Sequence, residues 1–151
     1  MMKRKTSRRA GVVLPLDACP QCATKMNPSR GPLSFPVNGE EMKGLRVSHL
    51  RCPSCEEGMF TIAEAKEMRE QAYAKYRKKY GLLTAEEIRQ IREQLRMSQR
   101  DLAKRLHLGE VTVSRWESNR VVQTAALDLL LRLMRDVPEV RKYIQNGRQA
   151  A

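Results

Sequence analysis

The chain has 151 residues, enough for one compact domain or two small ones. Its net charge is +12, from 29 Lys and Arg against 17 Asp and Glu, which favours partners that carry phosphate groups or acidic side chains. The hydrophobic fraction of 41% excludes a wholly disordered chain, and no apolar run approaches the roughly 20 residues of a membrane helix. The apolar patch of residues 12–16 is too short for a secretory signal, so we expect a cytoplasmic protein without a membrane partner.

Residues 1–17, MMKRKTSRRAGVVLPLD, are predicted to form a basic flexible tail. A run of Lys and Arg outside any hydrophobic pattern is usually a solvated extension of the chain. The alternative is that this tail follows the phosphates of DNA or RNA.

The chain has four cysteines in two matched pairs, Cys19 with Cys22 and Cys52 with Cys55, which spell C-x2-C-x29-C-x2-C. Cytoplasmic thiols stay reduced, so paired CxxC motifs favour a metal over disulfides. Four thiolates complete the tetrahedral shell of one structural zinc ion, whereas a catalytic zinc keeps an open position. His49 is the other nearby donor, and we expect it to be a surface or strand side chain.

Two short apolar segments lie between the cysteine pairs, Leu33–Val37 and Leu45–Leu50. Asn38-Gly39 follows the first segment, and this dipeptide favours the tight turn of a β-hairpin. We therefore predict a zinc-binding domain of short strands over residues 18–60. A unit of about 40 residues rarely folds without such a metal.

A linker helix is predicted over residues 61–83. Thr61 and Glu64 form a capping box at its start, and Gly81 is a plausible C-terminal stop. Its apolar positions are Ile62, Ala65, Met68, Ala72 and Tyr76. Its polar positions are Lys75, Arg77, Lys78 and Lys79. We interpret these cations as a solvated face, with direct contact to nucleic acid as the alternative.

Three short helices separated by tight connections are predicted in the first part of residues 84–147. Thr84 caps the first, Ser98 caps the second, and the third runs from about Glu110 to Ser118. Two short helices joined by a short turn are typical of a helix-turn-helix unit. Val113 and Trp116 have the spacing of core residues.

A fourth helix is predicted over Thr124–Arg135 and a fifth from Pro138 to Gly147, followed by a tail at residues 148–151. The apolar face of the fourth helix is broad enough to close the bundle and to form a homodimer. The residues predicted for this dimerisation are Leu127, Leu130, Leu131 and Met134.

The segment MSQRDLAKRLHLGEVTVSRWESNR resembles the helix-turn-helix of the XRE/Cro repressors. The matching features are Ser98-Gln99, the L-A-x-x-L of residues 102–106 and the S-R-W-E of residues 114–117. The wider arrangement over residues 18–146 resembles the MqsA (YgiT-type zinc finger) antitoxins. That resemblance implies an α+β protein, with a zinc module, a linker helix and an all-α domain of five helices.

The predicted third helix would place its first residues in the major groove of DNA. Val111 and Arg115 are one turn apart and share a face. Arg115 is suited to guanine and Val111 to a thymine methyl group, although the MqsA-type proteins carry a polar amide where Val111 aligns. The alternative for Arg115 is a surface cation paired with a carboxylate such as Glu117.

Four further residues complete the predicted DNA-binding set. Thr112 and Ser114 are small polar groups suited to phosphate contacts. Glu110 either accepts a hydrogen bond from cytosine or stabilises the positive N-terminus of the helix, and we favour the second role. The resemblance implies a phosphate contact for Gln99 and an anchoring role for Glu117.

We interpret the chain as an antitoxin and transcriptional repressor. It would bind operator DNA as a homodimer and neutralise a cognate toxin, a small RNase by the habit of the family. The alternatives are a zinc-containing regulator without a toxin, and a zinc enzyme or redox protein. The closed four-thiolate shell and the lack of an acid–base cluster argue against the enzyme, and no catalytic residue is predicted.

Overall fold

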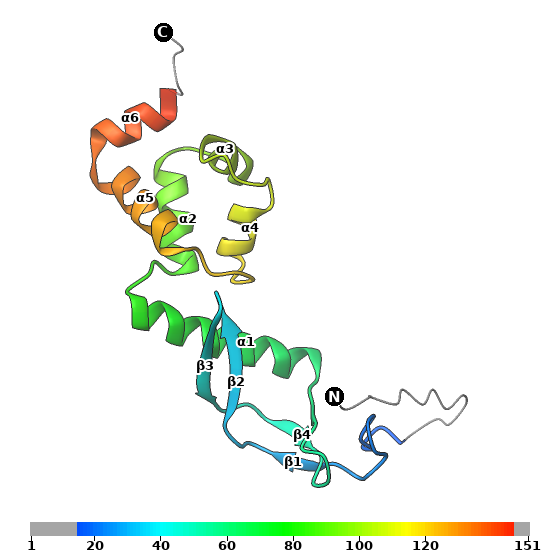
Figure 1. Ribbon diagram of the computed structural model, residues 1–151. Helices are drawn as coiled ribbons and strands as arrows, with labels where there is room; N and C mark the ends of the chain where they lie inside the picture. Colours follow the sequence, from blue (N-terminus) through cyan, green and yellow to red (C-terminus); the bar gives the residue numbers. More distant parts are fainter. Residues whose placement is uncertain (1–14, 147–151) are drawn as a thin grey trace, which may run out of the picture.

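The computed structural model describes residues 15–146 of the chain. The tail predicted over residues 1–17 lies outside this range except for its last three residues, and Gly147 and the tail at 148–151 lie outside it entirely. Figure 1 shows an elongated molecule with short strands at one end, a bundle of short helices at the other, and one long helix, α1, between them. The predicted α+β fold, a small cysteine-bearing module followed by a helical domain, is confirmed.

The strands at the cysteine end form a small antiparallel sheet in the order β1-β4-β5, with β1 at Asn27–Ser29, β4 at His49–Arg51 and β5 at Gly58–Met59. Its core is minimal and consists of Cys19, Met26 and Cys52, with Leu50 and Met59 packed against them. So small a core needs a further source of stability, which the metal supplies.

A separate hairpin is formed by β2, Leu33–Val37, and β3, Glu40–Leu45. Asn38 and Gly39 connect the strands with φ angles of 49° and 84°, the two positive values of the predicted tight turn. The strand predicted over Leu45–Leu50 is wrong. Leu45 is the last residue paired with β2 and His49 the first paired with β1, so the chain passes from one sheet to the other between them.

The hairpin packs on α1, Ile62–Tyr80, which begins with the predicted capping box of Thr61 and Glu64 and ends at Gly81 with φ 61°. The shared core contains Val37, Met42, Leu45, Ala72, Tyr73 and Val122. In Figure 1, β2 and β3 cross α1 and reach toward the helical bundle. The helix is therefore an integral part of a β-hairpin–helix unit, and Lys75, Lys78 and Lys79 of its predicted solvated face are exposed.

Two predictions about the faces of α1 are also wrong. Ile62, expected on the apolar face, is 92% exposed, because it precedes the segment that the hairpin covers. Arg77, expected on the solvated face, is only 8% exposed, because the helical domain covers it. Tyr73, which the apolar spacing omitted, is buried beside Ala72.

The helical domain contains five helices, as predicted. They are α2 (Ala85–Gln94), α3 (Gln99–Arg105), α4 (Thr112–Glu117), α5 (Ala125–Asp136) and α6 (Pro138–Asn146). The predicted capping residues Thr84 and Ser98 each form a complete capping box. Val113 and Trp116 lie in the core, as their spacing predicted. Among residues 15–146, no helix combines the length and the apolar character that crossing a membrane requires.

The prediction that Leu131 and Met134 form a dimer surface is wrong. Both side chains are 0% exposed and pack in the core of the helical domain, so neither can contact a second chain. Leu127 and Leu130 are half-buried against the same core. The large apolar side chains of α5 that remain exposed are Leu129 and Leu133, at 58% and 37%.

Leu131 and Leu129 form a matched pair on one helix. Leu131→Ala should lower the free energy of unfolding of the full chain by about 2–5 kcal/mol, because it leaves a cavity in the core. At a protein concentration low enough for the chain to be monomeric, Leu129→Ala should change it by less than about 0.5 kcal/mol. Urea denaturation followed by circular dichroism measures both values, and equal effects of the two substitutions would contradict this assignment of core and surface.

Candidate functional site

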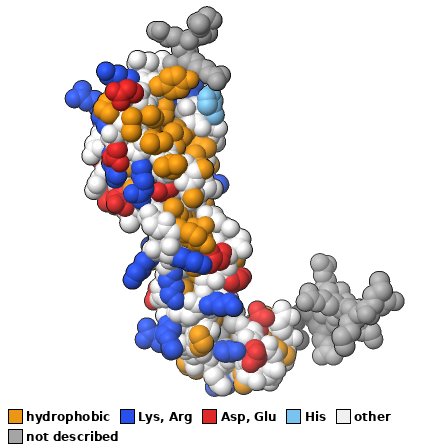
Figure 2. Space-filling model, turned by 60° about the vertical axis from the view of Figure 1, so that its left-hand side comes forward, with side chains coloured by type: hydrophobic (Ala, Val, Ile, Leu, Met, Phe, Trp, Pro, Cys, Tyr) orange, Lys and Arg blue, Asp and Glu red, His pale blue; other side chains and the backbone are white. Residues whose placement is uncertain are grey.

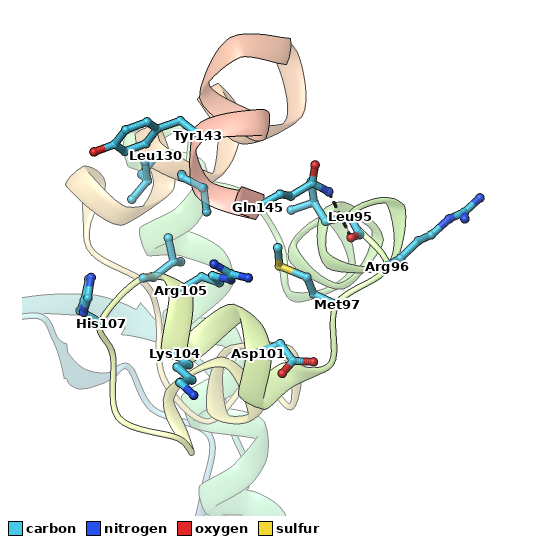
Figure 3. A pocket seen from close by; sticks show the side chains of 12 residues that line it. Leu95, Arg96, Met97, Asp101, Lys104, Arg105, His107, Leu130, Tyr143 and Gln145 are labelled. Carbon is cyan, nitrogen blue, oxygen red and sulfur yellow. Dashed lines mark hydrogen bonds between the residues drawn. The ribbon is translucent and has the colours of Figure 1, made fainter. Parts of the chain in front are cut away.

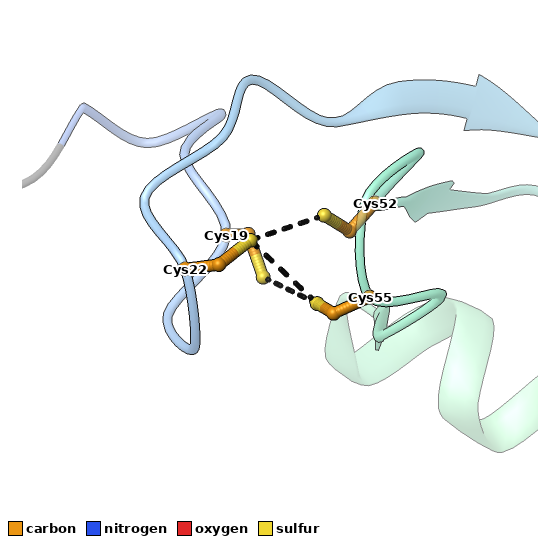
Figure 4. A group of neighbouring side chains, drawn as sticks. All are labelled: Cys19, Cys22, Cys52 and Cys55. Atoms are coloured by element: carbon orange, nitrogen blue, oxygen red, sulfur yellow. Dashed lines mark hydrogen bonds between the residues drawn. The ribbon is translucent and has the colours of Figure 1, made fainter.

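The two cysteine pairs lie on loops with the same local structure (Figure 4). In the first, the backbone N–H of Ala23 donates to the carbonyl of Cys19 at 2.8 Å, and Ala23 has a φ of 59°. In the second, the N–H of Glu56 donates to the carbonyl of Cys52 at 3.1 Å, and Glu56 has a φ of 61°. Each loop therefore turns back on itself and directs two sulfurs toward the other loop.

The four sulfur atoms form one compact group, all within 4.8 Å of one another. The separations include 3.5 Å between Cys19 and Cys55, 3.4 Å between Cys22 and Cys52, and 3.7 Å between Cys22 and Cys55. Tetrahedral zinc with Zn–S bonds of about 2.3 Å places its sulfurs about 3.8 Å apart. The arrangement therefore fits one zinc ion bound by all four cysteines.

The electrostatics of the site explain why a cation is needed. Side-chain and backbone hydrogen bonds with Thr24 lower the pKa of Cys22 to about 6. At Cys55, the backbone N–H of Glu57 lowers the pKa, but the other three sulfurs and burial outweigh it and raise the pKa to about 12. Four thiolates cannot share this volume without a compensating charge, and zinc supplies it.

His49 lies beside this group without joining it. It is buried in β4, its Nδ1 is 2.9 Å from the carbonyl oxygen of Val47, and its ring stacks on Phe60 with centroids 5.2 Å apart. The strand role predicted for His49 is therefore the one observed. Cys19 and Cys52 are buried while Cys22 and Cys55 are exposed, so one side of the four-sulfur site faces solvent.

The second candidate site surrounds α4. The carboxylate of Glu117, only 1% exposed, accepts hydrogen bonds at 2.6 and 3.0 Å from Arg92 of α2 and at 2.8 Å from Gln99 of α3. Burial alone would raise the pKa of Glu117, but these hydrogen bonds and the charges of Arg92 and Arg89 hold it below its ordinary value. An ionised carboxylate thus fixes three helices relative to one another.

The anchoring role implied for Glu117 matches this arrangement, whereas Arg92 was not predicted. Its position one turn after Ile88, on the inner side of α2, is the sequence feature that could have identified it as the partner of a buried carboxylate. The pairing of Arg115 with Glu117, considered as an alternative, is not observed. In residues 15–146, no ion pair or side-chain hydrogen bond involves the guanidinium of Arg115.

The predicted DNA-binding residues share one region of the helical domain. Val111 is the residue before α4 and is 54% exposed, and its carbonyl accepts the N–H of Arg115 at 3.0 Å, so the two lie one turn apart. Arg115 is exposed, and Thr112 and Ser114 are half-buried beside it. The region is therefore a short helix with one free cation at its exposed face.

Gln99 and Glu110 each already have a partner in the protein. One N–H of the Gln99 amide donates to Glu117, which leaves the second for an external acceptor. Glu110 lies before α4 and pairs with Arg100 at 2.8 Å, with both side chains largely exposed. Because this pair is solvated, it contributes little to stability and is easily broken.

A groove of about 1290 Å³ lies between α3, α5 and α6 (Figure 3). Its apolar lining includes Leu95, Met97, Leu106, Leu130 and Ile144. Asp101 and His107 lie at opposite ends of it, and the Asp101 carboxylate accepts hydrogen bonds from the cap residue Ser98. The groove thus has an apolar floor with ionisable side chains around it, and Leu130 is the residue that α5 contributes.

Removal of the metal should have a local effect. We predict one zinc ion per chain by elemental analysis of freshly purified protein, because the four sulfurs match one tetrahedral shell. Chelation should abolish the amide dispersion of β1, β4 and β5 in nuclear magnetic resonance spectra while α2–α6 keep their signals, because the helical core contains no ligand. Cys52→Ser should reproduce this pattern. A metal-free protein with an ordered β1-β4-β5 sheet would contradict it.

Comparison with curated proteins finds no match, whereas comparison with a model of a protein family agrees with this geometry. A family model described as the antitoxin component of the bacterial toxin-antitoxin system, MqsA, matches residues 17–145, which include all four cysteines and all of α1–α5. The match covers far more than half of the chain, so this protein belongs to the MqsA family of antitoxins.

Proposed function

We propose that this antitoxin represses its own operon by binding operator DNA through α3 and α4, and that its zinc-bearing half binds and neutralises a cognate toxin. The observation that carries the DNA-binding part is the free guanidinium of Arg115 on the exposed face of a helix that the Glu117 network holds in place. A fixed helix with a long unpaired donor is suited to the major groove.

The contacts divide into two kinds. Arg115 donates to the O6 and N7 of guanine, and Val111 contacts a thymine methyl group. Thr112, Ser114 and the free N–H of Gln99 bind phosphates, which position the protein without selecting a sequence. Glu110 lies before α4, where its charge stabilises the positive N-terminus of the helix.

We assign toxin binding to residues 18–60 together with α1. The family name implies a toxin partner, and the helical domain is the part that we propose binds DNA. We propose a small RNase as that toxin, encoded beside the antitoxin and bound in the cytoplasm. Capture of the toxin by the full chain should be lost after chelation, while DNA binding remains. Retention of the toxin by the chelated protein would contradict this assignment.

A homodimer is proposed through the exposed apolar surface of α5. Figure 2 shows hydrophobic side chains gathered over the helical end of the molecule. Leu129 and Leu133 of α5 are exposed, and Leu130 of the same helix lines the groove beside α6. Because two-fold DNA sites are bound by two-fold proteins, a second copy is the expected occupant. Leu129→Ala, which spares the core, should shift the protein toward monomer in sedimentation.

Base contact and general charge attraction can be separated with two substitutions. Arg115→Ala should cost about 1–3 kcal/mol of binding free energy per half-site on the operator and little on a scrambled duplex. Lys104→Ala, the control, removes one exposed cation of α3 and should lower the affinity for both duplexes equally.

The measurement is a titration of both variants on both duplexes at two salt concentrations. An equal loss of affinity for operator and scrambled DNA in Arg115→Ala would show that Arg115 contacts only the backbone.

A further inference from the structure

The long helix of the zinc-bearing half contacts the loop that follows α4. The Tyr73 hydroxyl of α1 donates a hydrogen bond to the carbonyl of Arg120 at 2.9 Å. Arg77, one turn further along α1, donates from Nη1 to the side-chain oxygen of Asn119. Val122 packs against Ala72 and Tyr73 in the core shared with the β2–β3 hairpin. Helix α1 therefore binds residues 119–122, far from it in the sequence.

The residues of this loop also terminate α4. Asn119 has a φ of 55°, its N–H donates to the carbonyl of Trp116 at 3.1 Å, and the N–H of Arg120 donates to the carbonyl of Arg115 at 2.8 Å. A left-handed residue with these two hydrogen bonds is a Schellman cap. The backbone of Arg120 thus contacts α1 through its carbonyl and Arg115 through its N–H.

We propose that Tyr73 is a positioning residue for the recognition helix, which acts through the cap of α4 without touching DNA. This inference rests on the proposed DNA contact of Arg115. Helix α4 has only six residues, too few to be stable alone, so its orientation depends on the groups that hold its ends. Glu117 fixes its inner side, and Tyr73 fixes its C-terminal cap.

The neighbouring Arg77 weakens the contact between α1 and residues 119–122, so that loss of the single hydroxyl of Tyr73 should loosen it. Arg77 is 8% exposed, and its Nε and Nη2 have no hydrogen-bond partner in the described part of the chain. Burial lowers the pKa of Arg77, in keeping with a cation that lacks a compensating carboxylate. An unpaired buried charge opposes association of the two surfaces. The hydrogen bonds of Tyr73 and Arg77 and the packing of Val122 hold α1 against the cap, and the burial of the Arg77 charge opposes them.

Two tyrosines of α1 provide a matched test in the full, zinc-loaded chain. Tyr73→Phe removes only the hydroxyl that binds Arg120. Tyr76→Phe makes the same change one turn away, where the ring packs against Tyr80 and the hydroxyl has no hydrogen-bond partner among residues 15–146. Each variant is titrated with operator and scrambled duplexes, and amide hydrogen exchange is measured without DNA.

Tyr73→Phe should accelerate exchange of the Arg120 amide and lower affinity for the operator by about 3- to 10-fold, with little change on scrambled DNA. Tyr76→Phe should change neither quantity. Unchanged exchange at Arg120 would overturn the positioning role whatever the DNA result, and so would an equal loss on both duplexes. If the unmodified chain does not distinguish the operator from scrambled DNA, the proposed function fails, while the exchange measurement still tests the contact.

Discussion

The buried carboxylate of Glu117 is the constraint on which the helical domain depends. Helices α3 and α4 have seven and six residues, so neither is stable without its neighbours. Glu117 joins them to α2 through Arg92 and Gln99, and the low pKa of its carboxyl keeps the charge that these partners require. Loss of Arg92 would leave a buried charge without its closest cation, and loss of Gln99 would remove a hydrogen bond from it, so the relative orientation of the three helices is specified rather than adjustable.

The zinc site applies the same principle at the other end of the molecule. Its apolar core is small, and four thiolates around one cation replace the hydrophobic contacts that so short a segment cannot provide. Between the two ends, α1 buries one side against the β2–β3 hairpin and contacts the cap of α4 through Tyr73. The part proposed to bind a toxin and the part proposed to bind DNA are therefore in direct contact through α1.

Features set by local sequence were predictable. The zinc ligands follow from two CxxC pairs, the hairpin turn from Asn38-Gly39, and three helix starts from capping boxes at Thr61, Thr84 and Ser98. Features set by distant contacts were not. Arg77 has the local pattern of a solvated cation and is buried only because residues 119–122 cover it. Leu131 and Leu129 are chemically identical, and only the packing of α5 makes one core and the other surface.

The central claim is that one chain presents α4 to DNA while its zinc-bearing strands remain free for another partner. The most direct measurement is a nuclear magnetic resonance titration of the isotope-labelled, zinc-loaded chain with a duplex from the promoter of its own operon. The account predicts that the largest amide shift changes fall on residues 99 and 111–115, with little change in β1, β4 and β5. Changes concentrated in those three strands, with α4 unaffected, would contradict it.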